Sequence, residues 1–327
     1  MSAIVVDSLS KQFNGKRAVD GIQFQVEKGS IYGFLGPNGA GKTTTINILC
    51  TLLKPTSGKA FVNGYDCEKQ PDLVRRSIGI VFQDTTLDKD LTAYENLLYH
   101  AILYRVSREK RAGTVNQALA FVGLSERKHD LVKRFSGGMK RRLEVARALV
   151  HQPEILFLDE PTLGLDPQSR ENLWSYVRTL PKERGITVFM TTHYMDEAEV
   201  CDKIGIIDHG KIIASGSPGE LKSGIGGDVI YLRTRDNEKA LQEVGTYLGI
   251  NAALDGDELY FSVENAESSI PRVIRTLGND VLSVRLQRPT LNDVFLKLTG
   301  RRIRESGMDG MDNLREDIRA YRRKHDR

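Results

Sequence analysis

Residues 36–44 read Gly36-Pro37-Asn38-Gly39-Ala40-Gly41-Lys42-Thr43-Thr44, which is the pattern G-x-x-x-x-G-K-[ST] of a phosphate-binding loop. The pattern has this meaning only between a strand and a helix. The apolar run 31–35 predicts a buried strand, and residues 43–53 have the apolar spacing of a helix. A glycine-rich turn that binds nothing is the alternative, but it requires neither element. We therefore expect this chain to bind a nucleoside triphosphate.

Each residue type in this loop has a chemical reason. Glycines let the backbone approach phosphate oxygens, and a helix N-terminus offers free N–H groups and a positive dipole end. Lys42 is expected to reach the β- and γ-phosphates, and Thr43 to hold Mg²⁺ through its hydroxyl. The expected nucleotide-binding residues of the loop are Gly36, Pro37, Asn38, Gly39, Ala40, Gly41, Lys42, Thr43 and Thr44.

Length and composition indicate a folded protein of two domains. With 327 residues, the chain exceeds the size of about 250–300 residues at which single cores stop growing. Hydrophobic residues make up 40% and charged residues 28%, which argues against a disordered or fibrous class. The formal net charge of +4 is mild and lacks the concentrated basic footprint of a nucleic-acid binder. We therefore expect no nucleic-acid partner.

The cysteines and the apolar runs indicate in which cellular compartment the chain works. Cys50, Cys67 and Cys201 are widely spaced, so they suggest neither a disulfide framework nor a zinc site, and a reducing cytoplasm fits best. No window approaches the 18 or so apolar residues of a membrane span, and the N-terminus lacks the features of a signal peptide. We expect that the chain is neither inserted nor exported on its own, and that a partner holds it if it works at a membrane.

Residues 1–222 have the pattern of an α/β domain. Apolar strands are expected at 4–6, 22–26, 31–35, 155–158 and 186–190, with a hairpin formed by 204–207 and 211–214. The continuous apolar runs are typical of parallel strands buried on both faces. Helix-period residues over 84–135, followed by another helical pattern, predict a helical subdomain of about 84–150.

A second, smaller domain is expected at 228–299. The glycine-rich segment 216–227 indicates a boundary, although residues 220–222 could form a helical turn. The pattern beyond it is strand 229–233, helix 238–248, strands 252–254 and 258–263, helix 266–277, strand 281–286 and helix 292–298. This order suggests a ferredoxin-like α+β domain. Residues 300–327 form a charged tail, either solvated or containing a short amphipathic helix.

Two acidic residues follow the strand predicted at 155–158. A nucleotide-hydrolysing site needs a carboxylate for Mg²⁺ and a base aligned with the γ-phosphorus. We expect Asp159 to hold the metal and Glu160 to polarise the attacking water. Surface or helix-capping acids are the alternative, but the phosphate loop in the same chain favours the catalytic interpretation.

A second anion site is predicted at the helix that begins near residue 136. Ser136 occupies an N-cap position, and Gly137 and Gly138 leave the helix N-terminus bare. Because the chain already has one phosphate loop, the second site suggests a triphosphate bound by another copy.

Taken together, these motifs resemble ATP-binding-cassette (ABC) ATPases in order and spacing, from residue 3 to about 222. They are the phosphate loop, Gln83, Ser136-Gly137-Gly138, Asp159-Glu160-Pro161, Gly164-Leu165-Asp166 and Thr192-His193. The resemblance implies a P-loop ABC-type ATPase fold with a helical insertion, and ATP and Mg²⁺ as cofactors. It implies that Lys42, Gln83, Glu160 and His193 are catalytic, that Phe13 stacks on adenine, and that Thr43, Gln83 and Asp159 lie near Mg²⁺. It also implies that Ser136, Gly137, Gly138 and Met139 form a signature that acts on the nucleotide of the other copy, and that Asp166 links the two copies.

Met139 departs from the usual signature, which has Gln there; hydrolysis is still expected, with altered nucleotide contacts. The run 136–143, residues 191–199 and residues 288–295 look like the daunorubicin-resistance (DrrA-like) branch of ABC-2 exporters. That branch implies an ATP-hydrolysing subunit at the cytoplasmic face of the membrane, paired as a homodimer or heterodimer of ATPase subunits. It also implies a separate integral membrane permease for a drug, antibiotic or similar hydrophobic compound, with a lipid, polysaccharide or peptide as open alternatives. The permease groove is expected at Leu87, Leu91, Tyr94 and Leu98, which could instead pack the helical insertion.

The sequence also leaves two other functions to be weighed. A soluble ABC ATPase acting on ribosomes or DNA would carry two cassettes or a long coiled coil, whereas this chain has one cassette and no sustained heptads. A non-hydrolysing regulatory module would be expected to lose Glu160 or His193, and both are present.

Overall fold

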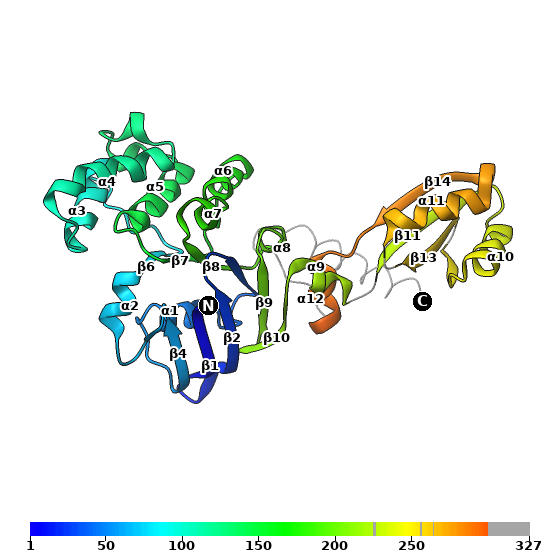
Figure 1. Ribbon diagram of the computed structural model, residues 1–327, viewed down its shortest axis with the longest axis horizontal. Helices are drawn as coiled ribbons and strands as arrows, with labels where there is room; N and C mark the ends of the chain where they lie inside the picture. Colours follow the sequence, from blue (N-terminus) through cyan, green and yellow to red (C-terminus); the bar gives the residue numbers. More distant parts are fainter. Residues whose placement is uncertain (225–226, 256, 264, 300–327) are drawn as a thin grey trace, which may run out of the picture. The chain divides into compact units, whose positions relative to one another are not determined.

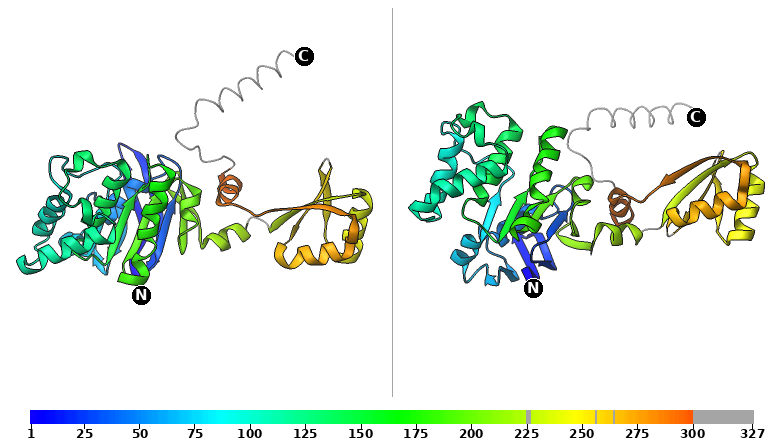
Figure 2. Two further views of the ribbon diagram at one scale, coloured as in Figure 1. Left: turned by 90° about the horizontal axis from the view of Figure 1, so that it is seen from above. Right: turned by 45° about the horizontal axis from the view of Figure 1, so that its top comes forward.

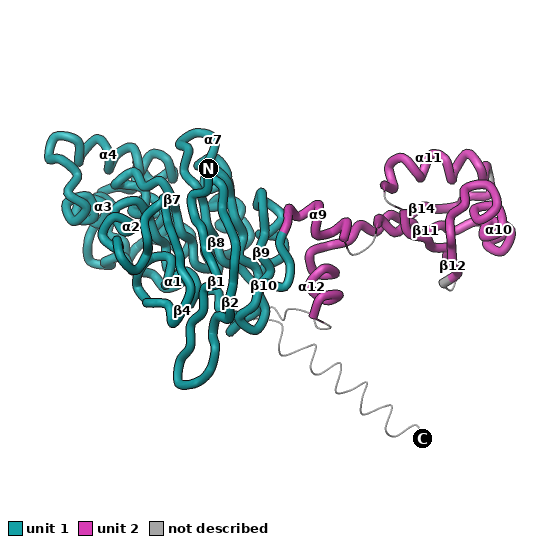
Figure 3. Tube along the Cα trace, turned by 60° about the horizontal axis from the view of Figure 1, so that its bottom comes forward, with its two compact units in different colours: residues 1–215, 304–327 teal, residues 216–303 magenta. Residues whose placement is uncertain are grey.

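The chain divides into two compact units (Figure 3). In the computed structural model the described residues are 1–224, 227–255, 257–263 and 265–299. The described part of the first unit is residues 1–215, and that of the second is residues 216–299. The tail predicted at 300–327 lies outside the described residues.

A six-stranded sheet forms the centre of the first unit. Its strands are β3 (Ile31–Leu35), β6 (Ile78–Val81), β7 (Ile155–Asp159), β8 (Thr187–Thr192), β9 (Lys203–Asp208) and β10 (Lys211–Gly216), in the order β10-β9-β3-β8-β7-β6. The pairs β9–β3, β3–β8, β8–β7 and β7–β6 are parallel. All residues of β3, β7 and β8 are buried, which explains their continuous apolar character. The predicted α/β class is therefore confirmed.

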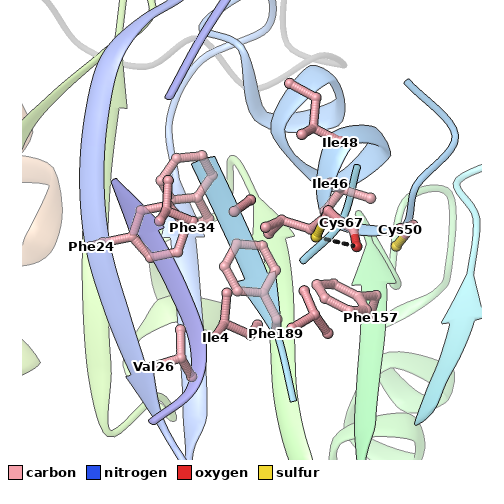
Figure 4. Close-up of a cluster of buried hydrophobic side chains, with 14 of the residues drawn as sticks. Ile4, Phe24, Val26, Phe34, Ile46, Ile48, Cys50, Cys67, Phe157 and Phe189 are labelled. Atoms are coloured by element: carbon pink, nitrogen blue, oxygen red, sulfur yellow. Dashed lines mark hydrogen bonds between the residues drawn. The ribbon is translucent and has the colours of Figure 1, made fainter. Parts of the chain in front are cut away.

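A second, antiparallel sheet packs against this core. It consists of β1 (Ser2–Phe13), β2 (Lys16–Glu27), β4 (Ser57–Val62) and β5 (Tyr65–Asp66), in the order β2-β1-β4-β5. The strands predicted at 4–6 and 22–26 are the apolar centres of the much longer β1 and β2. Between the sheets, Phe24 of β2 meets Phe34 and Phe189, and Phe157 contacts Phe189 (Figure 4). This apolar core anchors β3, β7 and β8.

Eight α-helices are described in the first unit: α1 (Lys42–Leu49), α2 (Pro71–Ser77), α3 (Ala93–Leu103), α4 (Arg108–Phe121), α5 (Gly137–Leu149), α6 (Pro167–Val177), α7 (Leu180–Arg184) and α8 (Met195–Ala198). Short 3₁₀ turns at Ser125–Arg127 and Val132–Arg134 join α4 to α5. The predicted helical insertion is thus built from α3, α4 and α5, which gather together in Figure 1. The helix predicted over 43–53 was too long: α1 ends at Leu49, because Thr51 has a left-handed φ of 62°.

The second unit has the predicted βαββαβ order. After α9 (Pro218–Ser223) it contains β11 (Asp228–Thr234), α10 (Asn237–Leu248), β12 (Ala252–Asp255), β13 (Glu258–Val263), α11 (Ala266–Leu277), β14 (Val281–Gln287) and α12 (Leu291–Thr299). The sheet order is β12-β13-β11-β14. Helices α10 and α11 pack on one face of this sheet, where Ile230, Leu232, Leu259 and Phe261 are buried (Figure 2).

Among the described residues, no helix has the length and apolar character needed to cross a membrane.

Candidate active site

Four neighbouring parallel strands end at the residues predicted to be functional. Gly36 follows β3, His193 follows β8, Glu160 follows β7, and Gln83 comes two residues after β6. The carboxyl ends of parallel strands share one edge of a sheet, and open α/β sheets bind ligands there. The strand order β3-β8-β7-β6 therefore brings together residues that are up to 157 positions apart in the sequence.

The phosphate loop depends on two glycines that pack against backbone carbonyls. A Cβ atom at Gly36 would lie 2.2 Å from the Ile207 carbonyl oxygen. Gly41, the N-cap of α1, has φ 110°, and a Cβ there would lie 2.5 Å from the Ala18 carbonyl oxygen. Only glycine satisfies both constraints without strain. The loop therefore wraps closely around the N-terminus of α1.

Lys42, Glu160 and His193 meet beside this loop. Lys42 Nζ donates hydrogen bonds to the carbonyls of Gly36 at 2.8 Å and Pro37 at 3.2 Å, and it lies 3.1 Å from Glu160 Oε1. His193 Nδ1 lies 3.3 Å from the same oxygen. All three side chains are buried, and His193 Nε2 has no hydrogen-bond partner among the described residues. The imidazole is therefore available to a ligand.

Asp159 and Glu160 are adjacent but have different surroundings. Burial raises the pKa of Asp159, and hydrogen bonds from Thr191 and Thr43 offset only part of this effect. Burial also acts to raise the pKa of Glu160, but the nearby His193 and Lys42 outweigh it, so this pKa lies below the ordinary glutamate value. Burial lowers the pKa of Lys42, against the opposing charge of Glu160. At neutral pH Glu160 is thus held ionised beside the loop.

The loop borders a cavity of about 560 Å³. It is lined by Phe13, Lys16, Arg17, Ala18, Asn38, Gly39, Gly41, Lys42, Thr43, Thr44, Gln83, Glu160, Leu163 and His193. Phe13 has 45% of its surface exposed at the cavity, as a stacking platform requires, and Gln83 is exposed as well. The cavity therefore joins an aromatic side chain, a phosphate loop and an ionised carboxylate.

The signature residues and Asp166 belong to two helix N-termini and do not line this cavity. Ser136 is the N-cap of α5, and its side chain accepts a hydrogen bond from the Met139 N–H at 3.2 Å. Asp166 caps α6 by accepting from the Ser169 N–H at 3.0 Å. Gly138 is buried, and a Cβ there would lie 2.3 Å from Ser169 Oγ, so α5 and α6 approach closely at this residue. Ser136, Gly137 and Asp166 are exposed, which leaves them accessible to another molecule.

One of the expected groove residues is in the wrong environment for docking. Leu87 is buried with 6% exposure, so it packs the protein interior instead of forming a surface. Leu91, Tyr94 and Leu98 are half-buried. The large apolar side chains exposed on this part of the chain are Tyr99, Ile102 and Leu103, near the C-terminus of α3. Leu87 therefore follows the alternative of packing the helical insertion, whereas a groove at Leu91, Tyr94 and Leu98 stays a prediction.

The structure also shows site residues that the sequence did not indicate. Thr191 donates its hydroxyl to Asp159 Oδ1 and accepts from the Glu160 N–H at 3.1 Å. The Arg141 guanidinium is buried against the carbonyls of Asp159, Glu160 and Pro161. A threonine in a strand and a basic residue in an Arg-rich helix have ordinary sequence contexts. The one sequence feature that could have indicated a role for Arg141 is its position three residues after Gly138, about one turn further along the same helix.

The donor set beside the loop fits a hard divalent cation. Thr43 and Gln83 line the cavity, and the buried Asp159 carboxylate is within hydrogen-bonding reach of the Thr43 hydroxyl. All three supply oxygen ligands, which Mg²⁺ prefers, and Mg²⁺ commonly binds through one or two carboxylates together with substrate phosphates. The residues present therefore fit the ion that the sequence predicts.

Comparisons with known proteins agree with this geometry. A model of the ABC transporter family matches residues 19–163, and a model of the DrrA1-3-like C-terminal domain of ATP-binding proteins matches residues 216–299. The daunorubicin/doxorubicin resistance ATP-binding protein DrrA of Streptomyces peucetius is 42% identical over 307 residues, which cover 91% of this chain and 92% of that protein. The chain belongs to the ABC transporter family.

Further proteins similar to this chain support the same family assignment. The Nod factor export ATP-binding protein I of Burkholderia lata is 40% identical over 301 residues, covering 91% of this chain and 97% of that protein. A dimeric structure of the ATP-binding cassette MJ0796, in a post-hydrolysis state bound to ADP and Pi, has 27% identity and a TM-score of 0.60, covering 65% of this chain and 98% of that one. The chain is an ATPase and the ATP-binding subunit of an ABC exporter. These findings support the exporter prediction and not the alternative of action on ribosomes or DNA.

Proposed function

We propose that this ABC ATPase energises efflux of a drug, an antibiotic or a similar hydrophobic compound through a separate membrane permease. The observation that carries the chemistry is that Glu160 Oε1 lies 3.1 Å from Lys42 Nζ and 3.3 Å from His193 Nδ1 beside the phosphate loop. The substrate class is supported by the S. peucetius relative, whose name records resistance to daunorubicin and doxorubicin.

The proposed hydrolysis uses the grouped side chains in distinct roles. Phe13 stacks on adenine, the loop N–H groups and Lys42 hold the phosphates, and His193 donates to the γ-phosphate. Water attacks the γ-phosphorus, the bond to the β–γ bridging oxygen breaks, and the proton of the water passes to Glu160. Because phosphoryl transfer has a loose transition state, orientation of the water matters more than the basicity of Glu160. A carboxylate with a pKa below its ordinary value suits that role.

Mg²⁺ would be held by Thr43, Gln83 and Asp159, and when bound it neutralises charge on the β- and γ-phosphate oxygens. The buried Asp159, fixed by Thr191, is oriented for this purpose. The ion would thus add its positive charge to that of Lys42 at the phosphates.

The working unit in this proposal is a dimer of ATPase subunits under a membrane permease, at the cytoplasmic face of the membrane. Ser136 and Gly138 contact the γ-phosphate held by the other subunit, and Asp166 lies between the subunits. The exposure of Ser136 and Asp166 at helix N-termini supports these roles, and the related cassette MJ0796 forms a dimer. Residues 1–222 act as the nucleotide-binding domain, residues 228–299 as an accessory domain and residues 300–327 as a charged tail.

Replacement of Glu160 by Gln tests the catalytic assignment. The change keeps the shape of the side chain and removes its charge, so ATP binding and ATP-dependent dimerisation are expected to persist. Phosphate release is expected to fall by at least ~10²-fold, the usual contribution of a general base. Glu154→Gln, at an exposed glutamate just before β7, is the matched control. Phosphate release from Glu160→Gln at the wild-type rate would contradict the assignment.

The transport assignment needs the permease. The ATPase is expected to co-purify from membranes with an integral membrane protein, and the reconstituted complex should hydrolyse ATP faster in the presence of its exported compound. A panel that includes daunorubicin, other hydrophobic antibiotics, ribosomes and DNA separates the hypotheses. Stimulation by ribosomes or DNA, without a membrane partner, would overturn the exporter assignment.

A further inference from the structure

Arg141 connects the signature helix to two backbone segments of the proposed catalytic site. It lies in the first turns of α5, and only 6% of it is exposed. Its Nε donates to the Pro161 carbonyl, and its Nη2 donates to the carbonyls of Asp159 and Glu160, each at 3.1 Å. Its Nη1 donates to the Phe82 carbonyl, directly before Gln83. One side chain of α5 therefore holds two backbone segments that border the cavity, next to Gln83 and at Glu160.

Glu144 completes this arrangement one helical turn later. Its Oε2 lies 3.1 Å from Arg141 Nη1, and the side chain is 2% exposed. Its Oε1 accepts hydrogen bonds from the Thr86 N–H at 2.9 Å and from the Thr85 hydroxyl at 3.1 Å. The pair therefore fastens the segment 82–86, which leads into the helical insertion, to α5.

The backbone that Arg141 holds is unusual. Glu160 has a left-handed φ of 44°, a conformation that a non-glycine residue adopts only when its surroundings enforce it. Its N–H is held by Thr191, and its carbonyl oxygen is held by Arg141. This backbone conformation directs the carboxylate toward Lys42 and His193. The Leu163 N–H also donates to the Glu160 carbonyl oxygen, at 3.3 Å, so Arg141 is one of several groups that maintain the backbone conformation of Glu160.

Only arginine can make this set of contacts. The guanidinium has five N–H donors in a planar fork and is charged at any physiological pH, whereas a lysine ammonium has three donors at one point. The guanidinium donates to four backbone carbonyls on two chain segments and to one carboxylate, so all of its N–H donors are engaged. A glutamine in its place would leave most of these buried carbonyls without a donor.

We propose that Arg141, supported by Glu144, is a positioning residue that couples the signature helix to Gln83 and Glu160. When α5 shifts as Ser136 meets a nucleotide, the fork carries both segments with it, so the water-orienting carboxylate and Gln83 reach their working positions together. This inference rests on the proposed roles of Glu160 and Gln83. It adds the link by which occupation of the signature is communicated to the hydrolytic site of the same chain.

The test is a double-mutant cycle between Arg141→Gln and Glu160→Gln, measured as phosphate release by the full chain. Arg141→Gln alone is expected to lower kcat by at least ~10-fold, with the KM for ATP within ~3-fold of wild type, because it removes orientation and not binding. In the Glu160→Gln background the same change is expected to lower residual hydrolysis by a clearly smaller factor, because the part of its effect that passes through Glu160 is already lost. If the two substitutions lower phosphate release independently, so that their fold-losses multiply in the double variant, the proposal is wrong.

Matched variants separate positioning from folding. Arg142→Gln changes the next residue of α5, which donates to the Val122 carbonyl at 3.0 Å and touches neither segment; its kcat is expected within ~2-fold of wild type. Arg141→Lys keeps three donors, so its kcat should lie between those of Arg141→Gln and the wild type. If Arg141→Gln does not fold, Arg141→Lys replaces it in the double-mutant cycle. Equal losses of kcat in Arg141→Gln and Arg142→Gln would show a structural role only. Wild-type turnover by the single Glu160→Gln variant would instead contradict the role of Glu160 itself.

Discussion

At the scale of single residues, the loop shows how close packing restricts a sequence. Gly39 and Gly41 both have positive φ, 80° and 110°, but their surroundings differ. A Cβ at Gly39 would have no atom within 4 Å, whereas one at Gly41 would lie 2.5 Å from a backbone carbonyl oxygen. Two glycines of one motif are thus required for different reasons.

This difference predicts different results for two alanine variants. Gly39→Ala should lower the free energy of unfolding by ~1–3 kcal/mol, the cost of a non-glycine residue in that conformation. Gly41→Ala adds a clash with rigid backbone, so it should be the more destabilised variant and should bind ATP at least ~10-fold more weakly. Urea unfolding and titration with a fluorescent ATP analogue measure the two quantities. Equal effects at both positions would show that the contact with Ala18 is unimportant.

At the scale of elements, the N-terminus of α5 has a structural and a proposed functional task. Ser136 caps the helix through the Met139 N–H, and the same exposed end is the proposed contact for the nucleotide of the other subunit. The two tasks need different chemistry. A cap needs a side-chain oxygen, whereas a phosphate contact cannot tolerate negative charge.

Ser136→Asp separates these tasks. Aspartate is as good an N-cap as serine, so the free energy of unfolding should stay within ~0.5 kcal/mol of wild type. Phosphate release should fall at least ~10-fold because the carboxylate repels the γ-phosphate, while ATP still binds the loop of the same chain. Ser136→Ala should lose ~0.5–2 kcal/mol of stability. Calorimetry and phosphate release distinguish the variants, and full activity in Ser136→Asp would rule out the proposed contact.

The elements also show what the sequence could predict. The phosphate loop, the buried strands and the helical insertion follow from local patterns, so their positions agree with the structure. The long β1 and β2 were predicted only at their apolar centres, because their ends alternate with polar residues. The contacts of Arg141 depend on three segments that tertiary packing brings together, and no pattern within α5 reveals them. The burial of Leu87, one of the expected groove residues, depends on tertiary packing in the same way.

At the scale of the whole molecule, a cluster of rings connects the helical insertion to the sheet. His100 of α3 lies 4.7 Å, centroid to centroid, from Tyr104, which stacks on His151 at 3.8 Å. His151 Nε2 lies 2.8 Å from the carbonyl of Ile78 at the start of β6. Burial, together with the charges of Arg147 and His151, lowers the pKa of His100 to about 3.

This lowered pKa predicts that stability depends on pH. Below the ordinary pKa of 6.5, the unfolded chain binds a proton at residue 100 that the folded chain excludes down to about pH 3. Stability should therefore be complete above pH 6.5 and fall with acidification, by at most ~1.4 kcal/mol per pH unit from this residue. His100→Phe should lose part of this dependence between pH 7 and 5. His129→Asn, at an exposed histidine, is the control, and equal slopes in both variants would contradict the prediction.

The three cysteines have a practical consequence for experiments on the dimer. Cys50, Cys67 and Cys201 are the whole cysteine content of the sequence, and each is a buried free thiol. Burial raises the pKa of each of them, so little reactive thiolate forms at neutral pH. Maleimide dyes should therefore spare the native thiols and attach to a cysteine introduced on the surface. Two labelled subunits could then report their approach by fluorescence energy transfer during turnover, without a cysteine-free background.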